Sequence, residues 1–257
     1  MPPPPPGDTE RMEGTPFTIG GPELVTDVSP AGWVVDGTRG PGYTVGSLVP
    51  RSFAAYARVF HPAYLDEAEV RWTTVAHGNG RLPHPSMEWI SITGSWQYLQ
   101  GSSDQPGLWN NQPTQGSLPV PQTARLSGLL ARHTTTANRC WFAVWRGFGA
   151  LAVPTAGIPT IAMTHRPMVL LTGPLTAATA SLEHPPWDRR ASLWWPEDRA
   201  WCVATDVDLM TTYVGGSRAC INVLTADDQL EAMPVPVDQR ITWDSDSINP
   251  TPPRTAH

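Results

Sequence analysis

The amino-acid sequence predicts an α+β fold: a single domain with a largely antiparallel sheet and three to four short helices. Short runs rich in aromatic and β-branched residues, bounded by Gly, Pro or Asn, indicate strands. Helical patterns fall between these runs without the regular alternation that characterises parallel βαβ units. The chain contains 29 Pro and 22 Gly but only 16% charged residues, a composition that favours many turns over a helical bundle.

We expect one globular domain over residues 17–248, with a flexible tail at each end. Residues 1–16 begin with a run of prolines and continue with glycine and acidic residues, which predicts a disordered proline-rich tail. Residues 249–257 are again rich in proline and polar residues, and we expect a flexible C-terminal tail there.

Four segments carry helical patterns. In the segment from Pro50 to Phe60, apolar residues recur at i, i+3, i+4 and i+7, starting at Phe53, and a His-Pro pair follows. In the last of the four, Ser217 is a plausible N-cap. The other three helices are predicted over residues 121–133, 174–183 and 217–224.

Six segments have the composition of strands, because aromatic and β-branched residues are concentrated in short runs between turn-forming residues. These predicted strands cover residues 70–76, 87–93, 140–146, 168–172, 200–208 and 230–235.

The charge balance excludes several classes of function. A formal net charge of −6 argues against nucleic acid as a partner, because no surplus of positive charge is available to neutralise phosphates. All 17 basic residues are arginine, so the chain has no lysine. Without a lysine amine there is no Schiff-base chemistry, no P-loop lysine and no kinase-type lysine. We expect no cofactor.

The cysteines and the N-terminal segment point to an intracellular protein. Cys140, Cys202 and Cys220 form no C-x-x-C pair, and the first two lie in apolar runs where buried free thiols are common. Acidic residues occupy the place where a signal peptide would need an apolar core, and no segment has the length of a membrane span. We therefore predict a cytoplasmic protein without a membrane partner.

Two Asp-x-Asp pairs are the first candidate site. Asp206 and Asp208 alternate near the end of a predicted strand, so that both carboxylates would leave the same face. Asp244 and Asp246 repeat this spacing near the C-terminus. If the pairs converge, four carboxylates could hold Mg²⁺ or Ca²⁺, or supply a general acid and base. The alternative is a solvated strand end and a turn-forming Asp-Ser-Asp, which we favour.

A second candidate site follows the first pair. Gly215 and Gly216 precede Ser217 and Arg218, and a helix is predicted to begin there. Exposed backbone N–H groups, a helix start and an arginine suit a phosphate or carboxylate ligand. An ordinary glycine turn with a serine cap explains the same residues and is favoured.

Tryptophan is the third signal, because twelve Trp residues outnumber Tyr and Phe, at five each. Trp194 and Trp195 lie beside proline and charged residues, which makes them the better candidates for a surface position where they could stack on a ligand, although core packing uses Trp equally well and both alternatives stay open. Trp141 and Trp145 alternate with apolar neighbours and are predicted to be in the core.

One long segment resembles a known group of proteins. Residues 194–208 read WWPEDRAWCVATDVD, and residues 212–217 read TYVGGS. This pattern is similar to that of an uncharacterised group of actinobacterial cytosolic proteins, and the resemblance spans about residues 44–249. The resemblance implies kinship and no particular activity.

Two functions remain open. The first is a non-enzymatic domain that binds an unidentified protein or small-molecule ligand, as an interaction or immunity-type protein. Its motivation is that no nucleophile–base pair, cofactor loop or zinc spacing is recognisable. The alternative is a metal-assisted hydrolase that uses the four aspartates, with Ser217 or Arg218 holding an anionic substrate. Convergence of the two Asp-x-Asp pairs would favour the hydrolase.

Overall fold

The computed structural model describes residues 21–40, 42–96, 104–163 and 166–253, so the predicted tail over residues 1–16 lies outside the described residues. At the other end, the predicted tail begins too early. Asn249 is buried, and its side-chain amide donates to the carbonyl oxygen of Leu82 at 2.9 Å. The carbonyl oxygen of Pro252 accepts a hydrogen bond from the Trp96 indole at 2.8 Å. The start of this segment is therefore packed against the body of the protein.

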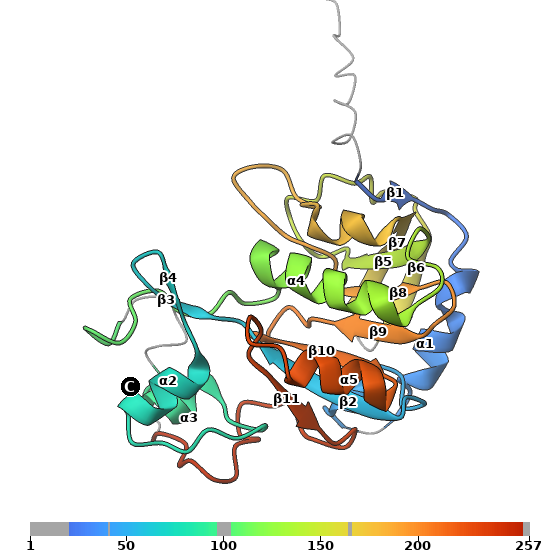
Figure 1. The fold of residues 1–257 in the computed structure, drawn as a ribbon. Coiled ribbons are helices and arrows are strands. Elements are labelled where there is room, and N and C mark those ends of the chain that lie inside the picture. Colours follow the sequence, from blue (N-terminus) through green and yellow to red (C-terminus); the bar gives the residue numbers. More distant parts are fainter. Residues whose placement is uncertain (1–20, 41, 97–103, 164–165, 254–257) are drawn as a thin grey trace, which may run out of the picture.

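An antiparallel sheet forms the centre of the molecule (Figure 1). Within the described residues it has nine strands. Eight follow the order β1-β7-β5-β8-β9-β10-β2-β11, and β6 pairs with β7 outside this path. The predicted α+β fold with a largely antiparallel sheet is thus confirmed. The strands of this sheet are β1 (Glu23–Leu24), β2 (Ala55–Phe60), β5 (Cys140–Trp145), β6 (Thr160–Met163), β7 (Arg166–Gly173), β8 (Leu193–Pro196), β9 (Trp201–Ala204), β10 (Thr211–Gly216) and β11 (Ala232–Val235).

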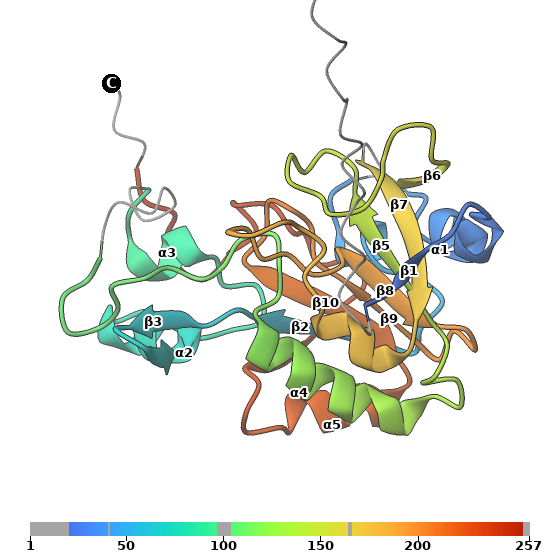
Figure 2. The same cartoon turned by 90° about the horizontal axis from the view of Figure 1, so that it is seen from above.

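Helices cover both faces of this sheet (Figure 2). Helices α4 (Val120–Leu130) and α5 (Arg218–Thr225) lie on one face, and α1 (Gly32–Gly37) lies on the other. Side chains alternate between the two layers, as the pleat of a strand requires. In β10, for example, Val214 belongs to the core under α4 and α5, whereas Tyr213 belongs to the core on the α1 side.

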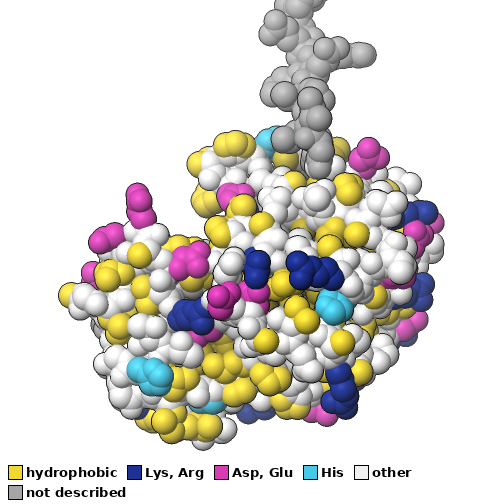
Figure 3. Space-filling model, in the orientation of Figure 1, with side chains coloured by type: hydrophobic (Ala, Val, Ile, Leu, Met, Phe, Trp, Pro, Cys, Tyr) yellow, Lys and Arg dark blue, Asp and Glu magenta, His cyan; other side chains and the backbone are white. Residues whose placement is uncertain are grey.

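A small lobe projects from one end of the sheet. It contains the hairpin of β3 (Ala63–Leu65) and β4 (Ala68–Val70), together with α2 (Trp72–Gly78) and α3 (Trp89–Thr93). Its own core is aromatic: the rings of Phe60, Trp72, Trp89 and Trp109 follow one another with centroids 5.1 Å apart. Figure 3 shows a hollow between this lobe and the α4–α5 layer, with arginine and acidic side chains close together on the same face.

The first predicted helix is wrong. Residues 55–60 form strand β2, which pairs with β10 on one side and β11 on the other. Its side chains from Tyr56 to Phe60 are all buried. A strand that is buried on both faces is almost continuously apolar, and such a run also satisfies the i, i+3, i+4 spacing of a helix.

Two predicted strands are helices instead. Residues 70–76 contain most of α2, and residues 87–93 contain α3. The aromatic and β-branched residues in both segments favour strands locally. Packing in the small lobe outweighs this preference, because all five residues of α3 are buried, and Gly94 at φ +73° ends the helix in the left-handed conformation.

The other predictions agree better with the structure. The helix predicted over residues 121–133 is α4 followed by the 3₁₀ helix Ala131–His133, and residues 217–224 correspond to α5. The strands predicted over residues 140–146, 168–172 and 230–235 correspond to β5, β7 and β11. Residues 174–183 form only the short 3₁₀ helix Leu175–Thr179. The strand predicted over residues 200–208 stops at Ala204, in β9.

Candidate functional site

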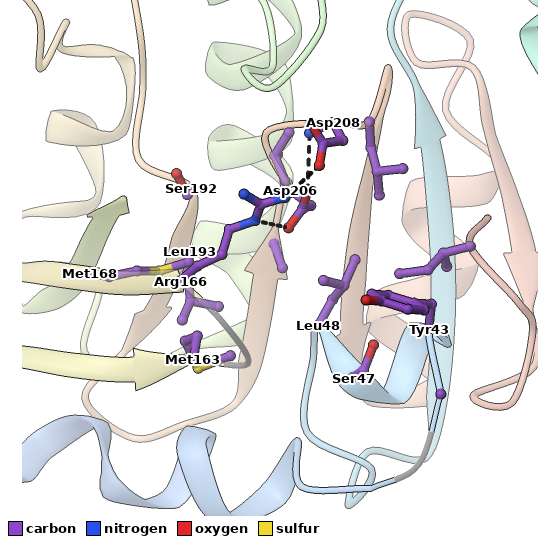
Figure 4. Close-up of a pocket in the computed structure, with 15 residues that line it drawn as sticks. Tyr43, Ser47, Leu48, Met163, Arg166, Met168, Ser192, Leu193, Asp206 and Asp208 are labelled. Atoms are coloured by element: carbon purple, nitrogen blue, oxygen red, sulfur yellow. Dashed lines mark hydrogen bonds and ion pairs between the residues drawn. The ribbon is translucent and has the colours of Figure 1, made fainter. Parts of the chain in front are cut away.

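A cavity of about 290 Å³ opens on the α1 side of the sheet, and we call it the α1-side cavity (Figure 4). Strands β6, β7 and β8 contribute one wall, the segment from Gly42 to Leu48 contributes another, and the turn between β9 and β10 closes one end. The residues that line it are Gly42, Tyr43, Ser47, Leu48, Met163, Arg166, Met168, Ser192, Leu193, Ala204, Thr205, Asp206, Asp208, Leu209 and Ile241.

Most of the cavity wall is apolar. Met163, Met168 and Leu193 come from β6, β7 and β8, and they also belong to the core on the α1 side of the sheet. Leu48 and Ile241 face them from the other wall. The wall is therefore a continuation of the protein core, and it offers a surface on which a ligand could bury hydrocarbon.

One end of the cavity is charged, and there Arg166 forms hydrogen bonds with two aspartates. This arginine is the first residue of β7 and faces the turn between β9 and β10. Its Nε donates to Asp206 Oδ2 at 3.0 Å, and its Nη2 donates to Asp206 Oδ1 at 3.2 Å and to Asp208 Oδ2 at 2.5 Å. The backbone N–H of Asp208 also donates to Asp206 Oδ1 at 3.0 Å. One guanidinium group thus holds both carboxylates of the turn.

The three charged side chains differ in exposure. The side chains of Arg166 and Asp206 are 23% and 20% exposed, whereas that of Asp208 is 69% exposed. One positive and two negative groups leave the cluster with a formal charge of −1, and the surplus lies on the side chain that solvent reaches. The guanidinium of Arg166 also lies over the ring of Trp145, 5.2 Å from its centroid, which fixes its position.

Ser192 adds an unused polar group to the same cavity. Its side chain is 2% exposed, and within the described part of the chain its hydroxyl has no hydrogen-bond partner. Its backbone is fully engaged, since its N–H donates to the Ala143 carbonyl and its carbonyl accepts from Thr205. A buried hydroxyl without a partner is costly, and a ligand or a water molecule would reduce that cost.

The candidate four-aspartate site does not form. Asp206 and Asp208 do lie together, but Asp244 pairs with Arg240 and Thr242, at 2.9 and 2.5 Å. Asp246 accepts hydrogen bonds from Asn249 and contacts His84 at 2.8 Å. Among the described residues, no three side chains of His, Cys, Asp or Glu are grouped as metal ligands would be. Each pair instead forms hydrogen bonds and ion pairs with its own neighbours.

The candidate anion site at the glycines is also not formed, whereas the favoured serine cap is present. Gly215 and Gly216 are buried inside β10, and their neighbours across the sheet are β2 and β9. Their backbone groups therefore belong to the sheet rather than to an anion-binding loop. Ser217 is the N-cap of α5, because its hydroxyl accepts from the Cys220 N–H at 3.1 Å. Arg218 is exposed at the start of that helix, away from the aspartates, on the opposite face of the sheet.

Trp194 and Trp195, the candidates for a surface position, are buried. Their exposed fractions are 3% and 1%, and they point into opposite faces of the sheet. They are core residues, because β8 lies between β5 and β9 in the interior of the sheet. Trp141 is in the core as predicted, whereas Trp145 is half-buried.

The three cysteines are free and buried, which for Cys140 and Cys202 agrees with their apolar sequence context. Burial raises the pKa of the Cys140 thiol to about 12 and that of Cys220 to about 11. Burial raises the pKa of Cys202 as well. Thiols that stay protonated at neutral pH are poor nucleophiles, so these residues have a structural role.

Comparison with protein-family models, with curated proteins and with solved structures finds no match for this chain. The resemblance to actinobacterial proteins therefore stays a prediction. Among the described helices, none combines the length and the apolar character that a bilayer crossing requires.

Proposed function

We propose that the protein binds a small molecule with an apolar body and a positively charged amine head in the α1-side cavity. One observation carries the proposal: a core-like apolar wall ends at a cluster of Arg166, Asp206 and Asp208 whose formal charge is −1. Of the two functions considered from the sequence, this proposal follows the non-enzymatic binding domain, with a small molecule as its ligand.

The size and shape of the cavity favour a small ligand over a protein partner. Small-molecule sites are concave and mostly apolar, with a few polar groups that fix orientation. A volume of about 290 Å³ is suited to a compact molecule such as a short alkyl or cyclic amine. Burial of the apolar body would contribute about 25 cal/mol for each Å² removed from water.

The charges select the head group. Arg166 makes a two-pronged ion pair with Asp206, and these two charges compensate each other. Asp208 gives one carboxylate oxygen to Arg166, and its exposed side chain is able to accept from a ligand N–H. A carboxylate ligand would be repelled by the surplus negative charge, whereas an ammonium group is attracted. Ser192 offers a further hydroxyl to a polar substituent.

The metal-assisted hydrolase has less support. It requires four carboxylates around one cation, and Asp244 and Asp246 are engaged elsewhere. At the remaining pair, a guanidinium group occupies the position between the two carboxylates. A divalent cation would have to displace Arg166 and leave its charge half-buried without a partner, which is unfavourable.

Calorimetric titration with three probes of equal chain length tests this proposal. We expect hexylamine to bind about tenfold more tightly than hexanol, and hexanoate to bind most weakly, because only the amine pairs with Asp208. In Asp208→Asn, hexylamine should lose this advantage while hexanol is unaffected. Asp228→Asn is the matched control, since it removes the same charge from an exposed position between α5 and β11.

Methionine methyl NMR gives the location of the bound probe. Resonances of Met163 and Met168 should shift on addition of hexylamine, because both side chains line the cavity. Equal binding of all three probes, or an unchanged hexylamine affinity in Asp208→Asn, would contradict the charge argument. Absence of any methyl shift at these two residues would contradict the cavity itself as the site.

A further inference from the structure

A second cavity, of about 310 Å³, lies on the other side of the turn between β9 and β10, where the small lobe meets the sheet. We call it the lobe cavity. Asp208 and Leu209 line both cavities, so the turn separates them. The lobe cavity is also lined by Arg58, Glu88, Trp72, Trp89 and Trp243.

A buried ion pair forms one part of its wall. The side chain of Arg58 is 2% exposed and that of Glu88 is 14% exposed, and Arg58 Nη2 donates to Glu88 Oε1 at 2.9 Å. Arg58 Nη1 donates to the carbonyl oxygens of Pro85 and Met87, at 3.1 and 2.9 Å. The pair is formally neutral, and Asp208 is directed towards Arg166, as Figure 4 shows. The lobe cavity therefore offers no unpaired cation to an anionic ligand, and the Asp208 carboxylate on its wall is bound to Arg166.

Two of the residues that line this cavity each have an unused hydrogen-bond donor. Within the described residues, Arg58 Nε and Trp89 Nε1 are buried and have no hydrogen-bond partner. Both groups donate only, and neither has an alternative role as an acceptor. A buried donor without a partner is costly, so two of them on residues that line one cavity call for an acceptor.

The rest of the wall is aromatic. The rings of Trp72 and Trp89 are in contact, with centroids 5.1 Å apart, and the guanidinium of Arg58 lies 5.8 Å from the Trp72 ring. Trp243 also lines the cavity and is 48% exposed, which places it at the solvent side. Flat indole and guanidinium surfaces bind planar rings well.

We infer that the lobe cavity is a second binding site, for an uncharged planar molecule that presents a carbonyl or ring-nitrogen acceptor to the N–H groups of Arg58 and Trp89. The ring would lie against the indoles, and Glu88 is placed to accept from an N–H of the ligand. This chemistry is that of an aromatic amide or a similar heterocycle. It differs from the amine proposed for the α1-side cavity, so either site can exist without the other.

Fluorine NMR of protein labelled with 5-fluorotryptophan tests this inference with benzamide, toluene and benzoate as probes. We expect benzamide to shift the resonances of Trp72, Trp89 and Trp243 saturably, because it carries both a ring and an acceptor. Toluene has the ring alone and should bind about tenfold more weakly. Benzoate should also be weaker, because its charge has no unpaired partner in this cavity.

Two variants separate a ligand site from a water-filled gap. Trp89→Phe keeps an aromatic ring and removes the N–H, so benzamide should weaken by about fivefold while toluene does not. Trp187→Phe is the control, since Trp187 is 61% exposed and does not line this cavity. If Trp89→Phe does not fold, Trp243→Ala should weaken both ring probes. Equal affinities of benzamide and toluene, or no shift of the three resonances with any probe, would overturn the inference.

Discussion

The buried side chain of His61 should make the stability of the folded protein depend on pH. It directly follows β2 and is fully buried. Its Nδ1 donates to the Thr114 carbonyl at 2.6 Å, and its Nε2 accepts from the Thr212 hydroxyl at 2.9 Å, so the neutral ring satisfies both partners. Burial lowers the pKa of His61 to about 4, further than the hydrogen bond to Thr114 raises it.

The lowered pKa of His61 predicts that the protein becomes less stable as the pH falls. Between about pH 6.5 and pH 4 the unfolded chain binds a proton at His61 and the folded protein does not, so acid should lower the free energy of unfolding by up to about 3 kcal/mol. Urea denaturation across this range should show the loss in wild type and a smaller loss in His61→Gln. His77→Gln, at an exposed position, should retain the wild-type slope. Identical slopes for the wild type and His61→Gln would contradict the assignment.

The individual residues of the α1-side cavity also show how much of this site can be predicted from the sequence. The spacing of Asp206 and Asp208 predicts that both carboxylates leave the same side of the chain, and in the structure both form an ion pair with one arginine. That partner, Arg166, is 40 residues earlier in the sequence than Asp206 and is one of 17 arginines. No local pattern distinguishes it from the others. Only the antiparallel arrangement of β7, β5, β8 and β9 brings it to the turn, and this order is not encoded in any short segment.

Helix α2 is a secondary-structure element that local sequence does not predict, because its stabilising contacts come from distant residues. Its first turn has no local cap, and its N-terminal residues favour a strand. Glu231, 159 residues beyond Trp72, accepts from the backbone N–H of Trp72 at 2.6 Å and of Thr73 at 2.8 Å. The strands β5, β7 and β11 could be predicted because their apolar runs and flanking turns are local. The helices of the small lobe could not, because a distant carboxylate and the aromatic core stabilise them.

Removal of this distant cap should loosen the helix. Glu231→Ala leaves two backbone donors of a part-buried helix end without a partner, so we expect a loss of about 2–3 kcal/mol of unfolding free energy. Glu231→Gln retains one acceptor oxygen and should lose about half as much. Chemical denaturation measures both variants, with Glu67→Ala in the exposed turn between β3 and β4 as the control. A loss in Glu231→Ala no larger than in the control would show that the carboxylate does not act as a cap.

At the scale of the whole molecule, strand β2 joins the sheet to the small lobe. Its residues alternate between environments: Ala57 and Val59 belong to the core under α4 and α5, whereas Phe60 belongs to the core of the lobe. Arg58, between them, holds the segment that leads into α3 through Pro85, Met87 and Glu88. One buried guanidinium group on β2 therefore binds the segment that leads into the small lobe, and it also contributes to the wall of the lobe cavity.

Replacement of Arg58 should therefore affect the lobe more than the sheet. Arg58→Met leaves Glu88 as an uncompensated, mostly buried carboxylate, and removal of one partner of such a pair costs about 3–5 kcal/mol. The double variant Arg58→Met/Glu88→Leu removes both charges and should recover part of this loss. Amide hydrogen exchange in Arg58→Met should accelerate in α2 and α3 and change little in β5 and β7, because those strands lie at the other end of the sheet. Uniform acceleration, or a double variant as unstable as the single one, would mean that the ion pair is not what joins the lobe to the sheet.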